Sequence, residues 1–175
     1  MPGAIVVRRL TASDAAAFHR LRLEQLELEP KTFAESTDEV RAVSLEATAQ
    51  RLAAPAGDSY VIGAFDGDDL IGTAGCFRSR EGKTRHKGRV WGVYVTSSRR
   101  RRGVGRALMQ AVIATASETS AIEQLTLAVA VPQLAATRLY ESLRFEVYGT
   151  ERRALKVGDE YVDEHLMMLR LRTDD

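Results

Sequence analysis

Arginines and glycines gather between residues 99 and 106 in an arrangement that suits the binding of a phosphate group. Gly103 and Gly105 lack a Cβ, so the backbone N–H groups beside them can approach a ligand closely. A strand pattern precedes this segment and a helical pattern follows it, and the first N–H groups of a helix bind anions at the positive end of its dipole. The segment therefore predicts a site for a phosphorylated cofactor.

The spacing of these glycines shows which of three known phosphate-binding motifs the segment matches. No Gly-Lys-Ser/Thr follows them, as the P-loop requires, and Leu108 stands where the dinucleotide fingerprint needs a third glycine. A third pattern is satisfied by residues 100–105: an Arg or Gln, two residues, Gly, one residue, and Gly or Ala. In this motif the chain resembles the GNAT superfamily of acetyl-CoA-dependent N-acetyltransferases, whose loop amides hold the pyrophosphate of coenzyme A.

A second segment, at residues 133–145, is similar to the later GNAT motif Asn-x-x-Ala-x-x-Leu-Tyr-x-x-x-Gly-Phe. Four positions match the motif: Ala136, Leu139, Tyr140 and Phe145. Two positions depart from it, because Gln133 replaces the usual Asn and Arg144 the usual Gly. The family's glycine suits a left-handed residue after a helix, so an Arg at position 144 is expected to cost about 1 kcal/mol relative to Gly.

The resemblance implies which residues bind the cofactor. An extended pantetheine arm should pair with a strand edge that a β-bulge at Gly92 exposes, and Tyr140 occupies the position of the proton donor to the departing thiolate. A phenol with a pKa near 10 can donate at neutral pH; the alternative is a ring buried in the core. The expected cofactor-binding residues are Val93, Tyr94, Val95, Arg100, Arg101, Arg102, Gly103, Val104, Gly105, Arg106, Gln133, Ala136 and Tyr140.

The general base is less well defined. An amine must be neutral to attack a thioester, although a free lysine amine has a pKa of about 10.4, so a base or a water chain must take one proton. Several family members use a Glu on the bulged strand, where this chain has Arg89, Val90 and Trp91. The candidates are His86, just before the strand, Glu35, between the first two helices, and a base that acts only through water.

The elements that must position these residues alternate along the chain, with no internal repeat and no linker. Strands are expected at residues 5–7, 60–65, 70–77, 90–95, 125–131, 145–150 and 161–171, and helices at 13–29, 45–53, 104–117 and 137–143. This order coincides with that of the family. We expect residues 1–175 to form one α/β domain with a mixed, mostly antiparallel central sheet flanked by helices, the GNAT-like acyl-CoA N-acyltransferase fold with splayed central strands.

Composition limits the other classes of function. The 25 Lys and Arg residues nearly balance the 24 Asp and Glu residues, so no global field draws the protein to nucleic acid or to a membrane. Cys76 is the only cysteine, no signal peptide is recognised, and no apolar run has the length of a membrane span, so a cytoplasmic location is expected. His19 and His165 lack partners at metal-ligand spacing, so no metal is expected.

These residues together predict an N-acetyltransferase that moves an acetyl group from acetyl-CoA to a primary amine of a small molecule or peptide, by direct attack in a ternary complex. Two alternatives stay open: a non-catalytic acetyl-CoA sensor, and a nucleic-acid-binding module that uses the arginines at 99–102. Loops at 30–40, 78–86 and 153–159 are expected to form the acceptor pocket. Dimerisation is common in the family, so a homodimer is a further expectation.

Overall fold

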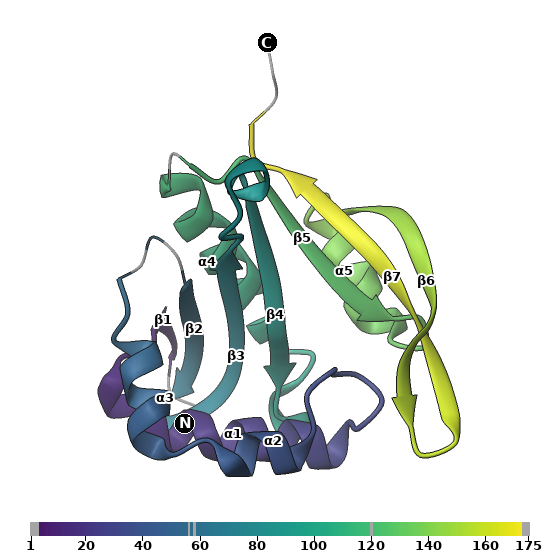
Figure 1. Ribbon diagram of the computed structural model, residues 1–175. Helices are drawn as coiled ribbons and strands as arrows, with labels where there is room; N and C mark the ends of the chain where they lie inside the picture. The colour runs from purple at the N-terminus through teal and green to yellow at the C-terminus, as the bar shows by residue number, and fades with distance from the viewer. Residues whose placement is uncertain (1–3, 56, 58, 120, 173–175) are drawn as a thin grey trace.

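The computed structural model describes residues 4–172 apart from 56, 58 and 120, and there the strands form one seven-stranded sheet (Figure 1). The strands are β1 (Ile5–Arg9), β2 (Ser59–Asp66), β3 (Asp69–Arg78), β4 (Lys87–Val95), β5 (Gln124–Ala130), β6 (Glu146–Val157) and β7 (Glu160–Arg170). The helices are α1 (Ala15–Leu28), α2 (Thr37–Ala42), α3 (Leu45–Leu52), α4 (Val104–Glu118) and α5 (Leu134–Ser142). The predicted order of elements is confirmed, with one helix added.

The added helix, α2, lies between the helices that we expected at residues 13–29 and 45–53, where no regular element was expected. Ser36 caps it: its hydroxyl accepts from the N–H of Glu39 at 3.3 Å, and the Glu39 carboxylate accepts from the N–H of Ser36 at 2.7 Å. This reciprocal capping box is visible in the sequence as Ser-x-x-Glu, followed by the buried Val40. The helix is short, so its apolar periodicity alone was too weak to predict it.

The sheet has the order β1-β2-β3-β4-β5-β7-β6, and all neighbours are antiparallel except β4 and β5. The parallel pairing joins Lys87, Gly88 and Arg89 to residues 124–126 and then stops. Beyond it the two strands diverge, as Figure 1 shows. The expected mixed, mostly antiparallel sheet with splayed central strands is therefore confirmed.

The β-bulge expected on β4 is present at Gly92. This glycine has φ of 60°, and the pairing of β4 with β3 shifts register between Thr73 and Gly75. A left-handed backbone angle is accessible to Gly without steric cost, so the bulge forms here. It bends β4 while leaving it paired to β3 on both sides.

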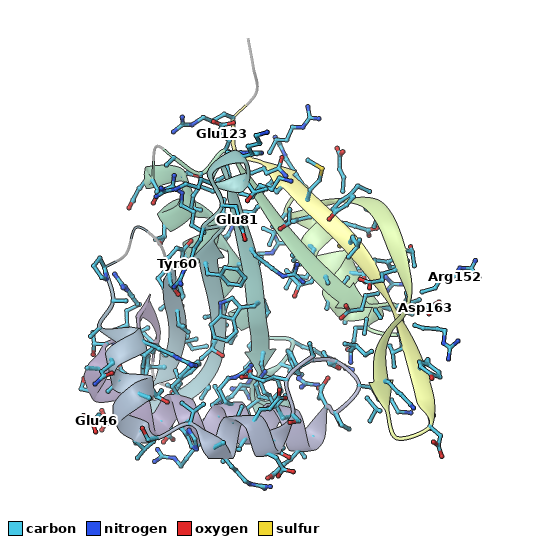
Figure 2. The ribbon with its side chains drawn as sticks, viewed as in Figure 1. Glu46, Tyr60, Glu81, Glu123, Arg152 and Asp163 are labelled. Atoms are coloured by element: carbon cyan, nitrogen blue, oxygen red, sulfur yellow. The ribbon has the colours of Figure 1, made fainter. Side chains whose placement is uncertain are left out.

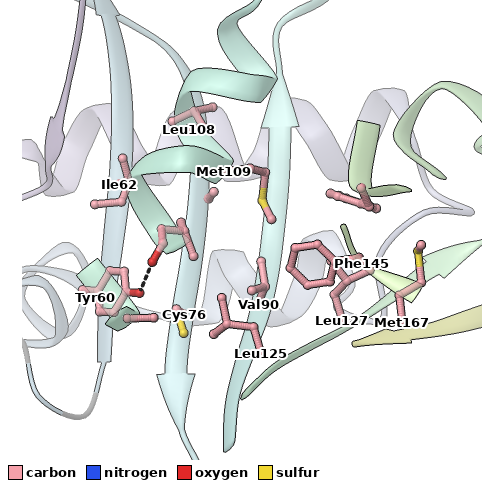
Figure 3. Close-up of a cluster of buried hydrophobic side chains, with 14 of the residues drawn as sticks. Tyr60, Ile62, Cys76, Val90, Leu108, Met109, Leu125, Leu127, Phe145 and Met167 are labelled. Atoms are coloured by element: carbon pink, nitrogen blue, oxygen red, sulfur yellow. Dashed lines mark hydrogen bonds between the residues drawn. The ribbon is translucent and has the colours of Figure 1, made fainter. Parts of the chain in front are cut away.

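The main core lies between the sheet and α4. Leu108, Met109 and Val112 of α4 pack on Val90 and Leu125 of the central strands, and the hydroxyl of Tyr60 donates to the Val112 carbonyl at 2.8 Å (Figure 3). Charged side chains such as Glu46, Glu123 and Arg152 lie on the outside of the ribbon (Figure 2). The rigid strands and α4 thus fix the segment that contains the glycines.

The end of α5 places Arg144 in the left-handed region, at φ of 69°. The N–H of Arg144 donates to the Glu141 carbonyl at 2.9 Å, and the N–H of Phe145 donates to the Tyr140 carbonyl at 3.0 Å. These two bonds form a Schellman cap, in which the residue after the helix is usually Gly. The left-handed conformation expected from the sequence is confirmed.

Replacing Arg144 with Gly should raise the free energy of unfolding by as much as about 1 kcal/mol, because Gly adopts this backbone angle without steric cost. Chemical denaturation of both proteins measures the difference. The matched control is Arg138→Gly, an exposed position inside α5, which should lower stability by about 1 kcal/mol. Destabilisation by Arg144→Gly would show that the arginine side chain makes contacts that outweigh the backbone cost.

Candidate active site

The glycine-rich segment connects the end of β4 to the start of α4. Its backbone turns through Arg101, at φ of 62°, and Gly103, at φ of 77°, which caps the helix. The first helical hydrogen bond runs from the N–H of Ala107 to the Gly103 carbonyl, at 3.0 Å. The N–H groups of the first turn therefore have no acceptor within the helix and can bind an anion.

This first turn forms one end of a cavity of about 610 Å³ between the diverging strands β4 and β5. Every predicted cofactor-binding residue except Arg102 lines it, while the Arg102 side chain is exposed outside it. Beyond Arg89 the β5-facing edge of β4 has no strand partner, and residues 93–95 lie on this open stretch. The opposite wall, which we did not predict, comes from Leu127, Ala128 and Val129 of β5. The predicted residues thus lie together, and their contacts with a cofactor stay a prediction.

Tyr140 combines features of both interpretations that the sequence allowed. The residue is buried, and its ring packs against Phe145 with 6.0 Å between the ring centroids. It also lines the cavity between β4 and β5. Burial raises the pKa of its phenol above the ordinary value, so the hydroxyl keeps its proton at neutral pH. A core position is therefore compatible with proton donation into the cavity.

Gln133, which replaces the usual Asn, ties the cavity to the end of α1. Its amide donates to Glu29 at 3.1 Å and to Thr32 at 2.8 Å. Glu29 also pairs with Arg100, whose Nε donates to the Val95 carbonyl at 2.9 Å. Glu29 therefore joins the start of the phosphate loop to the start of α5, a role that sequence analysis missed.

A second cavity, of about 630 Å³, lies on the α1 side of β4. Its walls include α1, α3, the loop after β3, and Trp91. Trp91 also lines the first cavity, so the two cavities share this residue of β4. Of the three loops expected to form an acceptor pocket, residues 30–40 and 78–86 contribute to the second cavity, and the described residues 153–159 contribute to neither.

The two side chains proposed as general bases lie in different places. Glu35 lines the second cavity and forms an ion pair with Arg22. His86 lies at the start of β4, where its carbonyl accepts from the N–H groups of Glu123 and Gln124, and it lines neither cavity. Among the described residues the structure thus brings Glu35 to a cavity and leaves His86 outside both.

Arg22 was not predicted as a site residue. Its side chain is only 7% exposed, and burial lowers its pKa although Glu35 acts in the opposite direction. A signal was present in the sequence: Arg22 stands four residues after Phe18 and four before Leu26, on the stripe of α1 that faces the interior. A charged residue on such a stripe is rarely buried without a partner or a function.

The described part of the chain holds no group of three or more His, Cys, Asp or Glu residues placed to bind a metal ion. None of the helices found there is long and apolar enough to cross a membrane.

A helix start next to two splayed parallel strands, with a bulge on the first of them, is the arrangement of the acyl-CoA N-acyltransferase fold. The GNAT acetyltransferase of Streptococcus pneumoniae has this fold, with a TM-score of 0.85 at 20% identity over 95% of this chain and 99% of its own. The chain itself belongs to the acetyltransferase (GNAT) family, whose model matches residues 20–145.

Two further relatives carry functional information in their names. The L-amino acid N-acetyltransferase AaaT of Escherichia coli (strain K12) is 26% identical over 163 residues, which cover 93% of this chain and 96% of AaaT. The yncA protein of Salmonella typhimurium, solved with its cofactor acetyl-CoA, has a TM-score of 0.82 at 20% identity over 99% of this chain and 97% of its own.

Replacing Gly103 with Ala should weaken coenzyme A binding by about tenfold or more, because a Cβ strains the left-handed turn that aims the loop amides at the pyrophosphate. Isothermal titration with coenzyme A measures the change. Gly158→Ala is the matched control: Gly158 also has positive φ (60°), and a Cβ there would also meet no atom within 4 Å, but it lies in the turn between β6 and β7. Equal affinities for coenzyme A in the two variants would show that the loop at Gly103 does not bind the pyrophosphate.

Proposed function

We propose that this protein transfers the acetyl group of acetyl-CoA to a primary amine of a small-molecule or peptide acceptor, by direct attack in a ternary complex. One observation supports this most strongly: two cavities share Trp91 as a lining residue, and the one between β4 and β5 is also lined by the first turn of α4, whose N–H groups have no acceptor within the helix. Separate cavities let donor and acceptor be bound together. The name of the AaaT relative makes free L-amino acids the first acceptors to test.

The residues around the first cavity fit coenzyme A. The first-turn N–H groups of α4 offer donors for the pyrophosphate, and the space beside Gly103 is open, since a Cβ there would meet no atom within 4 Å. The unpaired edge of β4 offers main-chain groups for the amides of pantetheine. When bound, acetyl-CoA supplies a thioester activated for attack.

The proposed reaction forms a C–N bond to the acceptor amine and breaks the C–S bond of the thioester. Tyr140 donates its proton to the departing thiolate, because it lines the donor cavity and its phenol is protonated at neutral pH. The proton of the attacking amine leaves through water, since Glu35 is paired with Arg22 and His86 lies outside both cavities.

The arginine run is better explained by a small ligand than by nucleic acid. Arg99 pairs with Asp66 at 2.8 Å, and Arg100 pairs with Glu29. These two cations are already neutralised by carboxylates, so the run presents less charge to a polyanion than its sequence suggests. A non-catalytic sensor is distinguished by turnover: acetyl-CoA and a panel of amines, amino acids and peptides should release free thiol from an enzyme and none from a sensor.

Replacing Tyr140 with Phe should lower kcat by about 10²–10⁴-fold and leave coenzyme A affinity unchanged, because the variant keeps the ring and loses only the acidic hydroxyl. Steady-state kinetics and coenzyme A titration measure both quantities.

Two variants accompany this experiment. Tyr148→Phe, at an exposed position on β6, should keep wild-type kinetics. Tyr140→Ala should lower the melting temperature, because it leaves a cavity beside Phe145. Wild-type kcat in the Tyr140→Phe variant, with a single-turnover rate that is also unchanged, would assign Tyr140 to packing alone.

A further inference from the structure

Arg22 leaves one nitrogen of its guanidinium unsatisfied inside the protein. Its Nη2 pairs with Glu35, whereas its Nη1 is buried and has no hydrogen-bond partner. Among the described residues, such unpartnered buried side-chain atoms occur only on Arg22, Gln25 and Trp91. A buried charged donor without an acceptor in the protein is costly, so an acceptor supplied from outside the chain would stabilise it.

The unsatisfied nitrogen lies beside the bulge of β4. Arg22 Nη1 lies 3.2 Å from the position that a Cβ on Gly92 would occupy, and its guanidinium lies over the Trp91 ring, 5.3 Å from the centroid. Gly92 lines the donor cavity and Arg22 lines the second cavity. The donor is therefore held beside the bulge of β4, at the boundary of the space where the thioester is expected.

The chemistry of this position favours a carboxylate. A guanidinium binds carboxylates through several N–H donors in one plane, and Glu35 uses only one side of this guanidinium. The second cavity is also rich in cations: its lining contains the arginines 22, 51, 78 and 80 but only the two carboxylates of Glu35 and Glu81. An anionic acceptor would complete the pairing of Arg22 and suit the charge of the cavity.

We infer that Arg22 binds the α-carboxylate of the acceptor through Nη1, so that the acceptor is a free α-amino acid and not the N-terminus of a peptide. This inference rests on the proposed function and names the substrate class of the same site. A carboxylate at Nη1 lies next to Gly92, and in an α-amino acid one carbon separates the carboxylate from the amine. The amine is thereby held beside the bulge. In a peptide, the first residue offers only a neutral carbonyl there.

The test compares L-amino acids with their amides, which keep the amine and side chain and lose the negative charge. In the wild-type protein, kcat/KM for the best L-amino acid should exceed that for its amide by about tenfold to hundredfold, because a neutral amide carbonyl binds Arg22 Nη1 more weakly than a carboxylate does. In Arg22→Met this preference should fall to about one, with coenzyme A affinity unchanged. Arg20→Met, at an exposed position on the same helix, should keep the full preference.

The Arg22→Met variant is expected to fold, because the Glu35 side chain that loses its partner is 40% exposed and water can solvate its carboxylate. If the variant does not fold, the ratio of kcat/KM for the acid and the amide in the wild-type protein tests the carboxylate subsite by itself. Equal kcat/KM for acids, amides and peptides would overturn the role of Arg22 and leave the proposed function intact.

A binding measurement separates the two conclusions further. With coenzyme A bound, the protein cannot turn over, so titration with the same amino acid and its amide reports only the carboxylate subsite. Binding of the acid and not of the amide, lost in Arg22→Met, supports the subsite even if no amine is acetylated. Turnover without any dependence on the carboxylate supports the enzyme and rejects the subsite.

Discussion

The separation of β4 from β5 is the constraint on which the rest of the site depends. Backbone N–H and C=O groups inside a protein are almost always hydrogen-bonded. These two strands nevertheless pair over only three residues of each, Lys87, Gly88 and Arg89 of β4 with residues 124–126 of β5. The bulge at Gly92 lets β4 turn away while it stays bonded to β3. The open edge then favours a ligand that has amides of its own, and the start of α4 lies at the end of that edge.

The departures from the family motif are accommodated by contacts around the donor cavity. Gln133 has a longer side chain than Asn, and it reaches Glu29 and Thr32 at the end of α1. Because Glu29 also pairs with Arg100, one carboxylate connects three segments around the donor cavity. At position 144 the Schellman cap forms although the residue is Arg and not the family's Gly. The cost of this change is a left-handed backbone angle that is strained for Arg. Neither change removes a wall of the cavity.

Features set by local sequence could be predicted, and features set by distant contacts could not. The phosphate loop and the bulge lie at glycines, whose backbone freedom is local, and the left-handed Arg144 was expected because the family's motif has Gly at that position; all three conformations are found. The burial of Arg22 depends on Glu35 and Trp91, which meet it only in the folded chain. His86 shows the reverse case: it is near the bulged strand in sequence, but the extended strand carries it away from Gly92. The helix α2 could be predicted only in part. Its capping box is a local signal in the sequence, but the helix has too few residues to show an apolar periodicity.

The pairing of arginines with carboxylates lets the protein offer N–H donors to negatively charged ligands while its net charge stays low. Both proposed substrates carry negative groups, the phosphates of coenzyme A and the carboxylate of the acceptor, yet the net charge of the chain is only +1. Arg99, Arg100 and Arg22 each have an acidic partner, which removes their charge from the long-range field. A guanidinium has five N–H donors, so an arginine that is already paired still has donors for a ligand. Ligands with negative groups that enter the cavities can therefore be bound at short range, while the chain as a whole, with its net charge of +1, exerts little long-range attraction on a polyanion.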